Sequence, residues 1–325
     1  MKPSMTGRLT AGADELLRGI RASGFPSWSA LGIEQGRAAI LELKALAGQA
    51  EPVAHVDPIP LFKSDPSLTA ELYRPESSTA LPVMVYLHGG GWVLGNHTGV
   101  DAVVRMLVNR SGCAILSMDY RLAPEHKYPA ALDDVYEALQ WVVAYGDKWG
   151  LDANRLAVGG DSSGANLAAA VSLLSRDKGG PPVIFQLLVY PALDHNYEND
   201  SYRRFGDGVS SALSRADVVW FHEHYVNRAE ELDLPYVSPL RADSFARLPR
   251  TLVLCAEIDP LLDEGVEYAR RLEQAGVPVE LQIYPGMFHC FWRMGAALPE
   301  SREAIDYAAG RMRQAMASSS SRATE

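Results

Sequence analysis

Short, continuous apolar segments alternate with amphipathic segments over the larger, C-terminal part of the chain. The apolar segments span residues 83–87, 114–118, 156–158, 183–189, 251–255 and 279–283. Between them, apolar residues recur at helical spacing over residues 130–145 and 264–275, and Gly276 follows the second of these as a C-cap. Uninterrupted apolar strands are typical of a parallel sheet that is buried on both faces. The pattern therefore predicts an α/β fold in which strands and helices alternate.

Two regions break this alternation. Over residues 13–46 apolar residues recur at helical spacing, and a Gly-Phe-Pro sequence separates two predicted helices. Strand-like segments follow at residues 53–62 and 68–73. Residues 194–238 are rich in Tyr, Arg, Asn and Asp and are helical around residues 216–226. This composition indicates an insertion that lies over the sheet.

The composition is that of an ordinary globular protein, with 325 residues, of which 47% are hydrophobic and 22% charged. A chain of this length can bury one large core or two domains. The formal net charge of -10 argues against a nucleic-acid partner, because binding to a phosphate backbone needs a basic surface.

The cysteines and the N-terminal segment bear on where the protein resides. Cys113, Cys255 and Cys290 form neither a disulfide framework nor a zinc-binding spacing. Residues 1–22 lack the continuous apolar core of a signal peptide, and no apolar run approaches membrane-spanning length. We therefore expect a cytoplasmic protein without membrane insertion, and neither a metal nor a cofactor is expected.

A serine between two glycines marks a candidate nucleophile. The sequence Gly160-Asp161-Ser162-Ser163-Gly164 follows the apolar segment 156–158 and precedes a helix-like segment at 166–174. Glycines on both sides permit a crowded strand-to-helix turn, and the N-terminal amides of the helix favour developing negative charge. Only Ser162 has glycines two residues away on both sides, which favours it over Ser163. Such a turn can also carry glycine and serine for turn geometry and capping alone.

A serine nucleophile needs a base and an acid that orients the base. His289 is the candidate base, because it lies on a predicted loop after the strand at 279–283. Asp259 is the candidate acid, because it closely follows the strand at 251–255. Three other carboxylates also remain candidates, namely Asp194 as the runner-up, followed by Asp263 and Glu257.

A glycine triplet offers donors for a developing oxyanion. His88-Gly89-Gly90-Gly91-Trp92 follows the strand at 83–87, and three successive glycines let main-chain N–H groups approach a substrate oxygen. A phosphate-binding loop is disfavoured, because no Gly-Lys-Ser/Thr sequence follows.

Together these motifs resemble the hormone-sensitive-lipase-like esterases, also called bacterial family IV, of the α/β-hydrolase fold. Further segments that carry the resemblance are residues 118–126 and 128–134, Asp259-Pro260-Leu261 and His289-Cys290-Phe291. The resemblance covers roughly residues 50–315. The chain departs from the family pattern at Cys290 and Ala165, where the family usually has glycine.

The resemblance implies a mostly parallel eight-stranded sheet flanked by helices, with a helical cap. Residues 1–50 and 194–238 would form the cap, residues 51–193 and 239–318 the catalytic domain, and residues 319–325 a disordered tail. Ser162 would be the nucleophile, His289 the base and Asp259 its orienting acid. The backbone amides of Gly90, Gly91 and Ser163 would form the oxyanion hole, and His88 would brace the glycine loop.

These roles imply a serine carboxylesterase that acts on small-molecule esters with short- to medium-chain acyl groups through an acyl-enzyme. We expect Trp92, Phe205, Trp220 and Phe221 to contact the substrate. Phe25, Trp28 and Tyr202 are further pocket candidates, although ordinary packing between cap and sheet would explain each aromatic residue equally well.

Alternative functions and the oligomeric state remain open at this point. The same triad could hydrolyse amides or lactones or act as a deacetylase, because leaving-group preference depends on pocket shape. A non-catalytic small-ligand receptor on the same fold is a further alternative. The strand at 279–283 would be a sheet edge, and the resemblance implies a homodimer that pairs through it.

Overall fold

The computed structural model describes residues 6–61 and 68–317. The predicted tail at 319–325 and the end of the predicted strand at residue 62 lie outside these residues. Within them, eight strands form one sheet in the order β1-β2-β4-β3-β5-β6-β7-β8. The pairs β1–β2 and β2–β4 are antiparallel, and the others are parallel. The α/β-hydrolase fold and its mostly parallel eight-stranded sheet are therefore confirmed.

The strands lie close to their predicted positions. Their bounds are β1 His55–Pro58, β2 Ala70–Arg74, β3 Leu81–Leu87, β4 Ala114–Met118, β5 Leu151–Asp161, β6 Val183–Val189, β7 Arg250–Ile258 and β8 Val279–Phe288. The prediction of residues 156–158 was too short for β5, because the strand begins where Leu151 pairs with Leu81. The prediction of 53–62 was too long at both ends, since β1 spans only His55–Pro58, the four residues that pair with β2.

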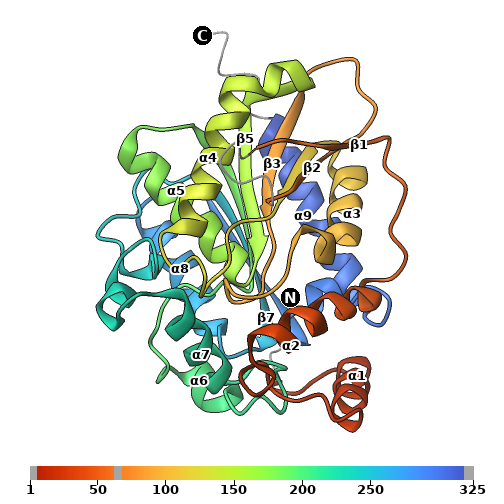
Figure 1. Cartoon of the computed structure of the whole chain (residues 1–325), viewed down its shortest axis with the longest axis vertical. Coiled ribbons are helices and arrows are strands. Elements are labelled where there is room, and N and C mark those ends of the chain that lie inside the picture. The colour runs from red at the N-terminus through yellow and green to blue at the C-terminus, as the bar shows by residue number, and fades with distance from the viewer. Residues whose placement is uncertain (1–5, 62–67, 318–325) are drawn as a thin grey trace.

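Helices cover both faces of the sheet (Figure 1). On one face lie α4 Ala130–Tyr145, α5 Ser163–Lys178 and α8 Leu262–Gln274, and on the other lie α3 Asp101–Ser111 and α9 Pro299–Ala317. Side chains along β3 alternate between two separate cores, with Val83 and Val85 in one and Met84 and Tyr86 in the other. Burial on both faces is the reason that the strands are continuously apolar.

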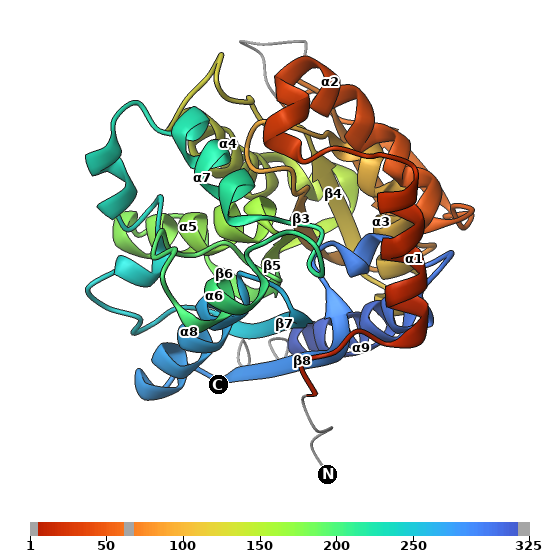
Figure 2. The same ribbon diagram turned by 90° about the horizontal axis from the view of Figure 1, so that it is seen from below.

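Four helices gather at one end of the sheet (Figures 1 and 2). They are α1 Ala11–Ala22 and α2 Trp28–Glu42 from the N-terminal region, and α6 Asp200–Phe205 and α7 Arg215–Tyr225 from the insertion. The buried carboxylate of Asp217 joins these two parts, because it accepts hydrogen bonds from the backbone N–H and hydroxyl of both Ser29 and Ser214. Two segments far apart in sequence thus cover the same end of the sheet.

In the described part of the chain, no helix combines the length and the apolar character needed to cross a bilayer. Strand β8 forms one edge of the sheet, as expected. Pairing of two chains through this edge stays a prediction.

Replacing Asp217 with alanine should destabilise the protein by about 2 kcal/mol, because four hydrogen-bond donors lose their charged acceptor in a buried site. Urea denaturation measures this loss. Asp14→Ala is the matched control, since Asp14 forms an exposed i,i+4 pair with Arg18, and its removal should cost roughly 0.5 kcal/mol or less. Equal losses in the two variants would show that Asp217 does not join the two segments.

Candidate active site

Ser162 lies on a sharp turn between β5 and α5. Its φ of 56° is in the left-handed region, which is strained for a residue other than glycine. A side chain at Gly160 or Gly164 would place Cβ 2.4 or 2.0 Å from the carbonyl oxygen of Leu87, far inside contact distance. The turn therefore packs directly against the end of β3, and only glycine fits at both flanking positions.

His289 and Asp259 lie in line with this serine. His289 Nε2 is 3.1 Å from Ser162 Oγ, and His289 Nδ1 is 2.7 Å from Asp259 Oδ2. Asp259 Oδ1 accepts a hydrogen bond from the N–H of Leu261 at 2.9 Å, which holds the carboxylate in place. The three side chains come from the carboxyl ends of β5, β7 and β8, where the loops of a parallel sheet converge.

The other candidate acids lie elsewhere. Asp194 forms an ion pair with Arg241 at 2.8 Å. Glu257 accepts hydrogen bonds from two backbone N–H groups, and Asp263 accepts one from Ser201 N. The structure thus brings Asp259 against His289 and directs the other three carboxylates to different partners.

The electrostatic environment of His289 is dominated by two opposing effects. Burial lowers the pKa of His289, but the charge and hydrogen bond of Asp259, together with those of Cys290, outweigh burial and raise the pKa well above 6.5. The hydrogen bond from Nδ1 to the carboxylate leaves Nε2 of the neutral ring free to accept a proton from Ser162.

The glycine loop after β3 carries backbone N–H groups without internal acceptors. The N–H groups of Gly90, Gly91 and Ser163 donate no hydrogen bond to any residue that the structure describes. The carbonyl of Gly90 accepts hydrogen bonds from Val93 N and Leu94 N. Because the peptide is trans and planar, these bonds turn the Gly91 N–H the opposite way. The loop therefore presents unpaired donors of the kind that bind an oxyanion.

Both glycines are required by their surroundings. A Cβ at Gly90 would lie 2.1 Å from the carbonyl oxygen of Leu94, and one at Gly91 would lie 2.2 Å from the ring of Phe221. Both also have positive φ, of 140° and 62°. The loop can therefore pack against Leu94 and against helix α7 only without side chains at these two positions.

A buried ion pair lies beneath the serine, and sequence reasoning missed it. Asp161 is 1% exposed, and Arg293 Nη2 lies 2.9 and 2.8 Å from its two carboxylate oxygens. The same carboxylate accepts hydrogen bonds from Gly89 N and from the hydroxyls of Tyr86 and Tyr190. The signal in the sequence was an arginine four residues after His289, in an otherwise apolar segment.

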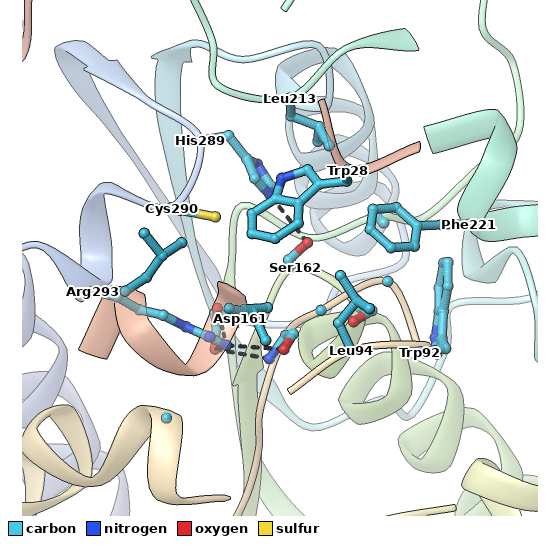
Figure 3. A pocket seen from close by; sticks show the side chains of 18 of the residues that line it. Trp28, Trp92, Leu94, Asp161, Ser162, Leu213, Phe221, His289, Cys290 and Arg293 are labelled. Carbon is cyan, nitrogen blue, oxygen red and sulfur yellow. Dashed lines mark hydrogen bonds and ion pairs between the residues drawn. The ribbon is translucent and has the colours of Figure 1, made fainter. Parts of the chain in front are cut away.

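An apolar cavity of about 70 Å³ opens above Ser162 (Figure 3). The indole of Trp28 lies over the serine, with Phe221 and Trp92 to one side and Cys290 and Arg293 to the other. A second cavity of about 230 Å³ shares Trp28, Leu43, Cys290 and Met294 with the first. These four residues therefore separate the two cavities.

Two of the four predicted substrate contacts line this cavity, and contact with a substrate stays a prediction. Trp92 and Phe221 line the cavity, whereas Phe205 and Trp220 do not. Trp220 on α7 packs edge-on against the ring of Phe221 and also against His224, so its indole contacts a residue that lines the cavity without lining the cavity itself. Phe205 is buried in the core that also contains Leu17.

Of the remaining pocket candidates, Trp28 lines the catalytic cavity, and Phe25 lines the second one. Tyr202 lines neither, because its hydroxyl is buried against Glu264.

The structure accommodates the two departures from the family pattern, Cys290 and Ala165, and the histidine before the glycine loop, His88. Cys290 adopts a φ of 70°, the left-handed conformation that glycine takes at lower cost. Ala165 is fully buried in α5. The ring of His88 stacks on Tyr120, and burial lowers the pKa of His88 to about 4, so His88 is neutral and structural. Across residues 6–61 and 68–317, no group of three or more His, Cys, Asp or Glu side chains could hold a metal ion.

Comparisons with known proteins agree with the fold. Residues 84–293 match the family model described as the alpha/beta hydrolase fold. The carboxylic ester hydrolase LipN of Mycobacterium tuberculosis is 41% identical over 74% of this chain and 65% of LipN, just under two thirds of its length. The ethyl acetate hydrolase of Pseudomonas putida is 36% identical over 85% of this chain and 88% of that protein.

Solved structures are similar over nearly the whole chain. One of them is a serine-to-alanine mutant of LAE6, an α/β hydrolase enzyme from the metagenome of Lake Arreo, with a TM-score of 0.90 and 38% sequence identity. The alignment covers 95% of this chain and 99% of the LAE6 chain. The hyperthermophilic esterase of Pyrobaculum calidifontis has a TM-score of 0.87 at 36% identity, with 94% of this chain and 98% of that one covered.

The reactivity of Ser162 toward a fluorophosphonate should rise with pH, because only neutral His289 can accept the serine proton. Since Asp259 raises the pKa of His289, half-maximal labelling should lie above pH 6.5. Asp259→Asn should lower this midpoint and slow labelling, because it removes the charge that raises the pKa. Labelling rates across a pH series measure both effects.

Asp194→Asn is the matched control and should leave the profile unchanged, because Asp194 is paired with Arg241. A midpoint that moves in the Asp194 variant and stays in the Asp259 variant would contradict the assignment of the acid.

Proposed function

The chain belongs to the α/β-hydrolase family, in its hormone-sensitive-lipase-like branch of carboxylic ester hydrolases, and we propose that it cleaves short- to medium-chain esters through an acyl-enzyme on Ser162. One observation carries the proposal. Ser162, His289 and Asp259 form a continuous hydrogen-bonded chain, at 3.1 and 2.7 Å, at the base of an apolar cavity. Unpaired amides of the glycine loop line the same cavity.

In the proposed reaction, His289 Nε2 takes the proton of Ser162 Oγ as this oxygen attacks the ester carbonyl carbon. The carbonyl oxygen becomes an oxyanion and accepts hydrogen bonds from the N–H groups of Gly90, Gly91 and Ser163. Such donors contribute about 3 kcal/mol each to transition-state stabilisation in related chemistry. His289 then gives the proton to the alkoxy oxygen, the C–O bond breaks, and the alcohol leaves.

Water completes the proposed cycle. His289 takes a proton from the water molecule as its oxygen attacks the acyl carbon. Collapse of the second oxyanion breaks the bond to Ser162 Oγ, which recovers its proton from His289, and the carboxylic acid leaves. Asp259 stays ionised throughout and stabilises the imidazolium that forms twice. The contact between His289 and Ser162 supports this role over that of a non-catalytic receptor.

Replacing Ser162 with alanine should lower hydrolysis of p-nitrophenyl acetate at least about 1,000-fold, because the variant lacks the hydroxyl that attacks the ester carbonyl. The steady-state rate of p-nitrophenol release measures this. Ser172→Ala, which removes a buried hydroxyl from helix α5 directly after Ser162, is the control and should retain the rate. Equal rates in the Ser162 variant and the wild type would refute the proposal.

Trp28 should set the upper limit on acyl size. The cavity of about 70 Å³ is smaller than the cavity of roughly 150 Å³ that holds a benzene molecule in another protein, so it favours short acyl chains. Trp28→Ala would join it to the second cavity and should raise the octanoate-to-acetate rate ratio about tenfold. A series of p-nitrophenyl esters from acetate to palmitate measures the shift.

Trp220→Ala is the matched control, because it removes another cap indole that lines neither cavity. Its rate profile should follow that of the wild type. The same shift in both variants would mean that loosening of the cap, and not the joined cavities, extends the accepted chain.

A further inference from the structure

Arg293 is placed to act on three parts of the active site at once. It ends the short helical turn Phe291–Arg293 that follows His289, so it belongs to the loop of the candidate base. Its Nη2 atom donates to Asp161, the residue before Ser162, at 2.9 Å. The same atom donates to the carbonyl oxygen of Gly89 in the glycine loop at 3.2 Å.

The Gly89 backbone is held from both sides. Its N–H donates to Asp161 Oδ1 at 3.2 Å, and its carbonyl accepts from Arg293. In the ion pair between Asp161 and Arg293, the carboxylate is buried and the Arg293 side chain is 15% exposed, and the pair resists rearrangement because a buried carboxylate is costly to leave without its counter-charge. The position of Gly89 is therefore fixed by two charged groups.

The carbonyl of Gly89 and the N–H of Gly90 belong to one peptide unit. This peptide is trans, so its carbonyl and its N–H point in opposite directions. When Arg293 draws the carbonyl toward itself, the Gly90 N–H turns away from Arg293. No described residue accepts a hydrogen bond from that N–H, and Gly90 lines the cavity.

A direct role for the guanidinium in binding anionic substrates is disfavoured. Arg293 lines the cavity, but Asp161 lies 2.8 Å from its Nη2 atom and compensates its charge. A substrate carboxylate would have to displace Asp161, which also holds Gly89 N and two tyrosine hydroxyls. The geometry leaves orientation of the glycine loop as the function of this side chain.

We propose that Arg293 is a positioning residue that sets the orientation of the Gly90 amide in the oxyanion hole through its bond to the Gly89 carbonyl. This inference rests on the proposed ester hydrolysis. Arg293 does not touch the reacting atoms; it acts through the peptide that it holds. Its loss lets that peptide rotate, so the oxyanion loses a well-aligned donor.

The test compares an oxygen ester with the matching thionoester, whose C=S group is a weak hydrogen-bond acceptor. Wild-type protein should strongly prefer the oxygen ester, because the oxyanion hole acts on it far more than on sulfur. In Arg293→Met, kcat for the oxygen ester should fall at least about tenfold, with KM within about threefold, because a transition-state donor is misaligned. The oxygen-to-sulfur rate ratio should fall by a similar factor.

The ratio separates positioning from a merely structural role. Partial unfolding lowers both rates equally and leaves the ratio unchanged, so an unchanged ratio would overturn the proposal. Arg293→Lys keeps a cationic donor and should recover part of the ratio. Arg302→Met is the matched control, because Arg302 donates to the carbonyl of Gly295 outside the glycine loop, and it should keep the wild-type ratio.

A second variant covers the case in which Arg293→Met does not fold because Asp161 is left unpaired. The double variant Asp161→Asn with Arg293→Met removes both charges, yet still leaves an acceptor for Gly89 N. It should show the same collapse of the ratio, and a wild-type ratio would overturn the proposal. Absence of any turnover that depends on Ser162 in the wild type would instead refute the proposed ester hydrolysis itself.

Discussion

The close contact between the turn that carries Ser162 and the end of β3 is the constraint on which the rest of the site depends. Gly160 and Gly164 allow the carbonyl of Leu87 to lie where a side chain would otherwise stand. This contact places the glycine loop beside the serine, because the loop begins directly after β3. It also leaves Asp161 buried, and a buried carboxylate needs partners. Arg293, from the loop of His289, supplies the charge that compensates it.

The fold was largely predictable from the sequence, because its strands are buried on both faces. The ends of a mostly apolar run such as residues 183–189 can be located directly in the sequence, and β6 has the predicted bounds. The predicted strand limits were wrong where pairing with a neighbouring strand determines them. β5 begins at Leu151 because Leu151 pairs with Leu81 of β3, a contact that the local sequence does not reveal. The meeting of Ser162, Asp259 and His289 was predictable because each follows a strand of one sheet.

The cavity walls were less predictable, because they depend on the direction of individual side chains. Trp220 and Phe221 are neighbours in sequence, yet only Phe221 reaches the cavity. Trp28 is placed by the bond of the adjacent Ser29 to Asp217, a contact across 188 residues that no local pattern reveals. The pairing of Asp161 with Arg293 was missed for the same reason. Where function depends on long-range contacts between loops, the sequence names candidates and the structure selects among them.

The central claim is that an acyl group passes through Ser162. The most direct test is mass spectrometry of the protein after rapid acid quenching during turnover of a short p-nitrophenyl ester. The account predicts one acyl group per chain, on the peptide that contains Ser162, at an early time point and its loss once substrate is exhausted. An acyl group found instead on Cys290 or Ser163, or turnover with no acylated protein at any time, would contradict the account.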